Sequence, residues 1–262
     1  MKANILILLL ISLFLFSCES KFDNTQAEEA IKKSFGLREN NSVEILGISS
    51  ESKNEAIVKF KIYAIWDFED EIVKFEIYED LISLKLRKYD SGWQIDEVQN
   101  VSGTWTPAEF FFEKEKQKDA MKDIRTISNA LVGFFIDNQH LPKQDGTYEE
   151  NSELYKSLSP FYVKVLPIKG PWGNSYRVYC GKACNDSYNG IKGYGSDYFI
   201  VASFGRDGEK EFFLAFDVMR PEFHLFDIKS MADFDKDLVM WFDSELCFMD
   251  AVWIRAPIYF SK

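Results

Sequence analysis

Two short phrases in the second half of the chain restrict its fold more than any other feature. The first runs from Gly170 to Tyr179, and the second runs from Tyr198 to Gly208. In the first, Pro171, Gly173 and Asn174 crowd into a turn that leads into β-prone residues. In the second, a β-prone run ends at Gly-Arg-Asp-Gly, where the chain must turn sharply. Each phrase therefore predicts a strand with a turn attached.

Read together, the phrases carry Pro-Trp-Gly-Asn-x-Tyr followed by Ser-x-Gly-x-Asp-Gly. In this they resemble the globular domain of the major pseudopilin of type II secretion systems. The resemblance spans about residues 118–241 and implies a long helix packed on an antiparallel sheet. A pilin subunit also needs an extended apolar helix start behind a Gly-Phe processing site, which this sequence lacks. The resemblance therefore covers the pilin-type head without its assembly stalk.

The pseudopilin resemblance also implies a structural calcium ion near the second turn. The implied ligands are Asp207, Asp235 and Asp237, with Asp233 as a further candidate, because calcium takes several oxygen ligands from an acidic loop. An alternative pairing of Asp207 with Asp217 keeps the family's spacing, but it replaces a Gly-rich acidic loop with aromatic residues. A third interpretation needs no metal: Asp-Gly is an ordinary turn, and Asp233 caps a helix that runs into Trp241.

The start of the sequence predicts export and lipid anchoring. An apolar run from Ile5 to Phe16 follows Lys2 and has the length of a signal-peptide core. It ends in Leu15-Phe16-Ser17-Cys18, which resembles the bacterial lipobox. That resemblance implies removal of residues 1–17, a diacylglyceryl thioether on Cys18 and an acyl chain such as palmitate on its amine. The expected location is the bacterial cell envelope, facing the periplasm or the exterior; the alternative is an ordinary secreted protein.

Outside the cytoplasm, Cys180 and Cys184 predict a local disulfide that closes a small loop after a strand. A metal site is the alternative, but no further His or Cys lies nearby to complete four ligands. Cys247 is expected to be a buried free thiol.

The predicted fold class is α+β, in two domains. After a tether at residues 18–24, a domain at residues 25–105 has a helix from Thr25 that ends near Gly36, followed by strands. The alternation from Glu55 to Trp66 is the clearest strand pattern. The further strands expected here are 43–48, 71–78, 81–89 and 93–98. This order resembles small cystatin-like or nuclear-transport-factor-2-like domains. The acidic residues at 67–71 are read as a solvated loop.

Thr106-Pro107 marks the start of the second domain, residues 106–262. A helix is expected from Ala108 to Asn138, because apolar residues recur at helical spacing in its second half. A short helix at 151–158 and strands at 176–179, 198–204, 211–218, 224–228 and 252–255 are expected to follow.

The net charge of −11 argues against a nucleic-acid partner, because phosphate binding needs a basic face. No nucleophile elbow, phosphate-binding loop or dinucleotide fingerprint occurs, and His140 and His224 lack a metal-binding spacing. The sequence therefore favours a non-enzymatic lipoprotein with a structural or protein-binding role in a secretion or surface assembly. The alternative is an envelope ligand-binding or hydrolytic protein with a pocket in the first domain, lined by Phe60, Trp66 and Trp93. A relative that keeps only the fold is a third interpretation.

Overall fold

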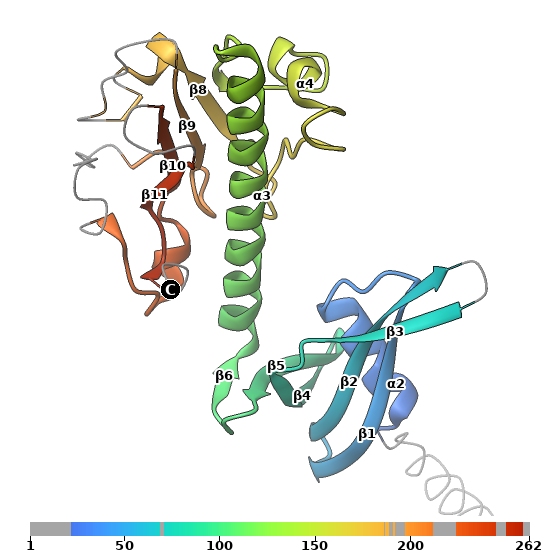
Figure 1. Ribbon diagram of the computed structural model, residues 1–262. Helices are drawn as coiled ribbons and strands as arrows, with labels where there is room; N and C mark the ends of the chain where they lie inside the picture. The colour runs from blue at the N-terminus through green and yellow to red at the C-terminus, as the bar shows by residue number, and fades with distance from the viewer. Residues whose placement is uncertain are drawn as a thin grey trace, which may run out of the picture. The chain divides into compact units, whose positions relative to one another are not determined.

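The computed structural model describes residues 22–68, 71–185, 187–188, 191, 197–211, 224–244 and 250–258. It confirms an α+β protein with two antiparallel sheets and one long helix (Figure 1). The chain forms two compact units that meet between Phe111 and Phe112. The boundary lies later than the predicted 105/106, because strand β6 (Trp105–Pro107) pairs with the first sheet.

Helix α2 (Asn24–Ser34) opens the first unit. It begins one residue before the expected start, because Asp23 caps it by accepting a hydrogen bond from the Gln26 N–H at 2.9 Å. The helix ends where expected, next to Gly36, which adopts a positive φ of 58°. Its apolar face is formed by Ala27, Ala30 and Ile31, all of which are buried.

The first sheet is centred on one long strand, β2 (Glu55–Phe68), which pairs with three other strands. The other strands are β1 (Asn41–Ser52), β3 (Glu71–Ile77), β4 (Leu81–Tyr89), β5 (Gly92–Asn100) and β6. The order is β1-β2-β4-β5-β6, and all pairs are antiparallel. Strand β4 pairs with the first half of β2, and β3 pairs with the second half. The alternating residues of β2 bury Val58, Phe60 and Ile62 against α2, which confirms the pattern seen in the sequence.

Helix α3 (Ala108–Asn138) has the predicted bounds and organises the second unit. Figure 1 shows the second sheet along one side of α3 and helix α4 (Glu153–Leu158) on the other. The buried stripe of α3 consists of Met121, Ile124, Ile127 and Leu131. This stripe belongs to one core with the strands of the second sheet. None of the helices in the described part of the chain combines the length and apolar character that a membrane crossing needs.

The second sheet has the order β11-β10-β9-β8-β7 and is antiparallel throughout. Its strands are β7 (Asp145–Thr147), β8 (Arg177–Cys180), β9 (Tyr198–Ser203), β10 (Leu238–Asp243) and β11 (Val252–Arg255). Two 3-10 turns, η1 (Gly181–Cys184) and η3 (Met231–Phe234), precede β9 and β10. Both turn phrases supply the predicted strands, as β8 and β9.

Two expectations for the second unit differ from the structure. The segment 224–228 is not a strand, because its only ladder contact is an isolated bridge between Phe226 and Pro257. The chain after Asp233 does not continue as a helix into Trp241; η3 is short, and β10 follows. The expected strand at 211–218 lies almost wholly outside the described residues.

Candidate functional site

The two turn phrases lie against each other in the second unit. Asn174 donates from Nδ2 to the carbonyl oxygens of Gly205 at 3.0 Å and Arg206 at 3.1 Å. Gly208 makes room for this side chain, because a Cβ at position 208 would lie 2.9 Å from the Asn174 side-chain oxygen. We call this contact between Asn174 and residues 205–208 the turn junction.

The first phrase is also fixed to helix α3. Trp172 donates from Nε1 to Glu113 at 2.7 Å, and the Tyr176 hydroxyl donates to Asp123 at 2.7 Å. Burial raises the pKa of Asp123, although the hydrogen bond from Tyr176 opposes that effect. Tyr176 itself is buried. The two hydrogen bonds therefore connect the turn before β8 to helix α3.

Asp207 and Asp235, two of the predicted calcium ligands, lie near the turn junction with other partners. Asp207 is exposed and accepts from the Glu209 N–H at 3.0 Å, which is an Asx turn. Asp235 accepts two hydrogen bonds from the Arg206 guanidinium, at 2.8 and 3.1 Å. This bidentate pair connects the second turn to the end of η3.

Asp233 lies inside η3 and forms a capping box with Ser230, the N-cap residue. The metal-free interpretation, in which Asp233 caps a helix that runs into Trp241, was wrong in this respect. The Asp233 Oδ2 accepts from the backbone N–H groups of Lys229 and Ser230 at 2.9 and 2.8 Å. Its Oδ1 pairs with Lys236 at 2.5 Å. The hydrogen bond from Lys236 is the main reason why the pKa of Asp233 lies well below its usual range.

Asp237 differs from the other three predicted calcium ligands because its side chain is fully buried. Its Oδ2 accepts from the Tyr188 hydroxyl at 3.0 Å and from the Glu211 N–H at 3.2 Å. Its Oδ1 has no hydrogen-bond partner among the described residues. Burial is the main cause that raises the pKa of Asp237 to about 7, with a smaller contribution from the Glu211 charge.

Glu211 and Arg255 complete this buried network. The Arg255 guanidinium donates to Glu211 at 3.0 and 3.3 Å, and Glu211 accepts from the Asp237 N–H at 2.9 Å. Sequence reasoning missed both residues. The available signal was Arg255 itself, a charged residue inside an apolar strand pattern that requires a buried partner.

Within the described ranges, no three histidine, cysteine or acidic side chains gather closely enough to hold a metal ion. The carboxylates of Asp207, Asp235, Asp233 and Asp237 each have different partners in the structure. In this arrangement they do not fit one shared calcium ion. Asp217, from the alternative pairing, lies outside the described residues. Calcium binding stays a prediction, and a melting temperature that rises with added calcium would establish it.

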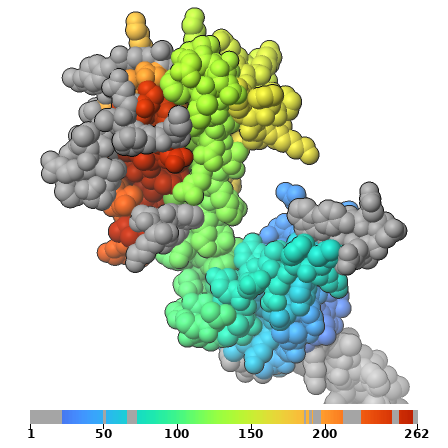
Figure 2. All heavy atoms as spheres, in the orientation of Figure 1, coloured from blue at the N-terminus to red at the C-terminus, as the bar shows by residue number. Residues whose placement is uncertain are grey.

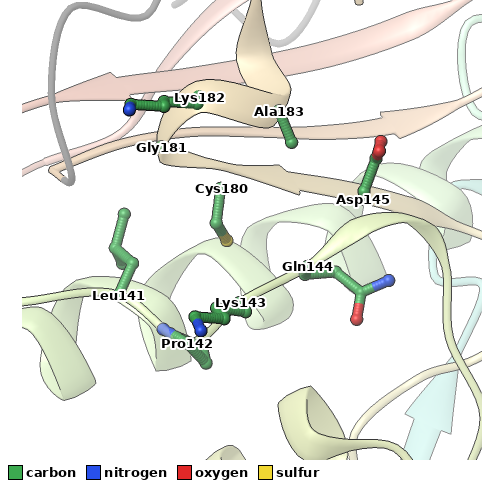
Figure 3. A pocket seen from close by; sticks show the side chains of 9 residues that line it. All are labelled: Leu141, Pro142, Lys143, Gln144, Asp145, Cys180, Gly181, Lys182 and Ala183. Carbon is green, nitrogen blue, oxygen red and sulfur yellow. The ribbon is translucent and has the colours of Figure 1, made fainter.

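The disulfide expected between Cys180 and Cys184 is not formed, because the structure has both residues as buried free thiols. Turn η1 directs the Cys184 thiol to the carbonyl oxygens of Tyr179 and Tyr198, at 3.2 and 3.6 Å. The Cys180 side chain instead points toward the segment around Pro142 (Figure 3). Burial raises the pKa of both thiols, that of Cys184 to about 12, so neither is a reactive thiolate at neutral pH.

A pocket lies beside Cys180, between the segment that follows α3 and the end of β8 (Figure 3). Its volume is about 770 Å³. The lining combines apolar side chains with the cations Lys143 and Lys182 and with Asp145. The edge strand β7 starts at its rim, and the Cys180 N–H donates to the Gln144 carbonyl at 3.0 Å. Sequence reasoning gave no signal for this pocket, because its two sides are far apart in the chain.

The remaining predicted sites give less information. Cys18 and Cys247 lie outside the described residues, as does the side chain of Trp66. In the first unit, Phe60 is 3% exposed and packs in the core near Phe35, and Trp93 stacks obliquely on Phe22 at 4.2 Å. Phe60 therefore belongs to the core of the first unit, and Trp93 packs against that core.

No family model matches the chain, and searches of curated proteins and of solved structures also give no match.

Proposed function

We propose that this chain is a lipid-anchored bacterial envelope protein whose second unit is a pseudopilin-type head with a non-enzymatic, protein-binding role. The lipobox-like sequence at Cys18 supports the anchor. The turn junction supports the pseudopilin resemblance, because Asn174 of one phrase holds the backbone of the other. The motif residues carry structural contacts, which favours a binding role over catalysis.

An exposed apolar patch at one end of the second unit carries the binding role. Phe161 is 81% exposed and Val165 is 65% exposed, and both lie in the segment that follows α4. Phe161 contacts the Tyr162 ring, with centroids 4.9 Å apart, and Tyr162 donates to Asp137 at 3.0 Å. The patch is therefore held on a supported loop, and such patches mark interaction sites.

The charge around this patch indicates the chemistry of the partner. Between Leu154 and Gly170 the sequence has three lysines and no acidic residue, although acidic residues outnumber basic ones 42 to 31 in the whole chain. Lys156, Lys164 and Lys169 are all exposed. Figure 2 shows this segment, in yellow, protruding from the surface. The patch fits a protein face with an apolar recess and an acidic rim.

The rival function, ligand binding or hydrolysis in the first unit, has less support. Phe60 and Trp93, two of its three expected lining residues, pack against other aromatic side chains there. The charged groups of that sheet pair on its surface, as Arg87 does with Glu55 at 2.9 Å. An assembly role in secretion or in surface fibres therefore remains the proposed context.

The docking patch is tested by photo-crosslinking in intact cell envelopes. A photoreactive phenylalanine analogue replaces Phe161, and the control carries it at Phe75, which is 53% exposed in the first unit. We expect one protein to be captured only from position 161. Once purified, that protein should bind the wild-type chain and lose affinity for the Phe161→Ser, Val165→Ser double variant by at least about tenfold, as burial of these two side chains requires. Equal capture from both positions, or capture of lipid alone, would contradict the proposal.

A further inference from the structure

The pocket beside Cys180 has an apolar floor. Leu141, Pro142 and Cys180 are buried there, and they come from the segment after α3 and from the end of β8. The pocket volume of about 770 Å³ falls inside the range of about 300–1,000 Å³ that is typical of small-molecule sites. A pocket of this volume with an apolar floor accepts the apolar part of a small organic molecule.

Two cations stand at the rim of this floor. Lys143 and Lys182 are both exposed, and neither has an ion-pair partner within the described residues. They come from opposite walls of the pocket, because Lys143 precedes β7 and Lys182 lies in η1. In a chain with a net charge of −11, two unpaired lysines that face one pocket produce a local field that attracts anions.

The other polar groups of the lining do not cancel this field at the lysine end. Gln144 is engaged, since its Nε2 donates to the carbonyl oxygens of Gly146 and Thr147 at 3.2 and 2.9 Å. Asp145 is exposed and lies on the opposite side of Cys180 from Lys182 (Figure 3). The pocket therefore carries positive charge on two opposite walls, and the Asp145 carboxylate lies to one side of Cys180 (Figure 3).

We propose that this pocket binds a small organic anion, with an apolar body on the floor of Leu141, Pro142 and Cys180 and its acidic group between Lys143 and Lys182. A carboxylate, sulfonate or phosphate monoester meets the requirement for the acidic group. The site is independent of the lipid anchor and of the Phe161 patch, so its existence does not rest on the proposed protein-binding role.

Fluorescence titration with 1-anilinonaphthalene-8-sulfonate tests this site, because the dye is anionic and brightens in apolar surroundings. The neutral N-phenyl-1-naphthylamine has nearly the same apolar body and serves as the matched probe. We expect the sulfonate to bind one site, and Lys143→Gln with Lys182→Gln to weaken it by about tenfold while leaving the neutral probe unchanged. Lys156→Gln with Lys164→Gln removes the same charge elsewhere and should leave both probes unchanged.

A second variant separates this pocket from other apolar surface. Ala183→Phe places a ring in the pocket without a change of charge and should abolish sulfonate binding, while an unchanged melting temperature shows that the chain still folds. Phe161→Ser should not affect the dye. Absence of sulfonate binding, binding that survives Ala183→Phe in the folded chain, or an equal loss with the Lys156 and Lys164 pair would overturn the proposal.

Discussion

The Asn174 side-chain amide donates hydrogen bonds to the carbonyl oxygens of Gly205 and its neighbour Arg206, which follow Asn174 in the chain by 31 and 32 residues. The two sequence phrases that suggested a pilin-type head are thus in direct contact. The asparagine satisfies backbone groups of a turn that the sheet alone would leave without partners. This contact makes the turn junction the most informative place for substitutions.

Asn174→Ala is expected to lower the free energy of unfolding by about 1–3 kcal/mol, because two partly buried carbonyl groups lose their donor. Thermal unfolding of the two proteins measures the difference. Asn40→Ala is the control, since among the described residues the exposed Asn40 side chain makes one long bond, of 3.4 Å, to the Ile65 carbonyl. Equal losses at the two positions would show that the junction has no special role.

Gly205→Ala is expected to destabilise the second unit by more than about 2 kcal/mol. Gly205 has a φ of 62°, and a Cβ there would lie 2.4 Å from the Asp235 carbonyl oxygen. Gly36 has a φ of 58° but open space around it, so Gly36→Ala should cost only about 1 kcal/mol of backbone strain. Chemical denaturation of both variants separates the clash from the strain, and similar losses would argue against the close approach.

Asp237 should make stability depend on pH near neutrality. Its pKa of about 7 in the folded chain lies above the ordinary value of 3.8, so between these values the folded chain holds a proton that the unfolded chain has lost. Stability therefore falls as pH rises through this window, by at most about 1.4 kcal/mol per pH unit, and levels off above pH 7.

Asp237→Asn should remove this contribution, so that its stability relative to the wild type improves as pH rises from 4 to 7. Unfolding curves at several pH values provide the measurement. Asp207→Asn is the control, because an exposed asparagine can keep the Asx turn to Glu209. A difference between wild type and Asp237→Asn that stays constant with pH would mean that Asp237 is ionised throughout.

Cys180 and Cys184 should both react with an alkylating reagent in denatured protein that has not been reduced, because the structure has them as free thiols. Denaturation is needed, since both side chains are buried. Mass spectrometry of the peptide that contains both residues gives the result. A peptide that takes up label only after reduction would restore the disulfide predicted from their spacing.

Long elements with one buried face were predictable from their periodicity, whereas β10, whose six residues are all buried, was not predicted as a strand. The apolar stripe of α3 gave the correct bounds of that helix, and the alternation in β2 gave the start of the strand, which continues two residues beyond the predicted end at Trp66. The short strands β6 and β7 were missed, since pairing with a neighbour defines them and their three-residue sequences carry no period. The end of α2 was predictable from Gly36, whereas its cap fell to Asp23 and not to Thr25.

The candidate sites were less predictable for a related reason. Asp233, Asp235 and Asp237 alternate in the sequence, but η3 and the start of β10 send their side chains to three different partners. The partners of the buried Asp237, Tyr188 and Glu211, lie 49 and 26 residues away and belong to no common motif. Spacing alone cannot reveal an environment that distant segments create.

The proposal that the chain is a lipid-anchored head is tested most directly by the mass of the N-terminal peptide of the protein isolated from bacterial envelopes. The account predicts a chain that begins at Cys18 and carries a diacylglyceryl group with an acylated amine, and it predicts loss of that mass in the Cys18→Ala variant. An unmodified N-terminus, or a mature chain that begins at any other residue, would contradict it.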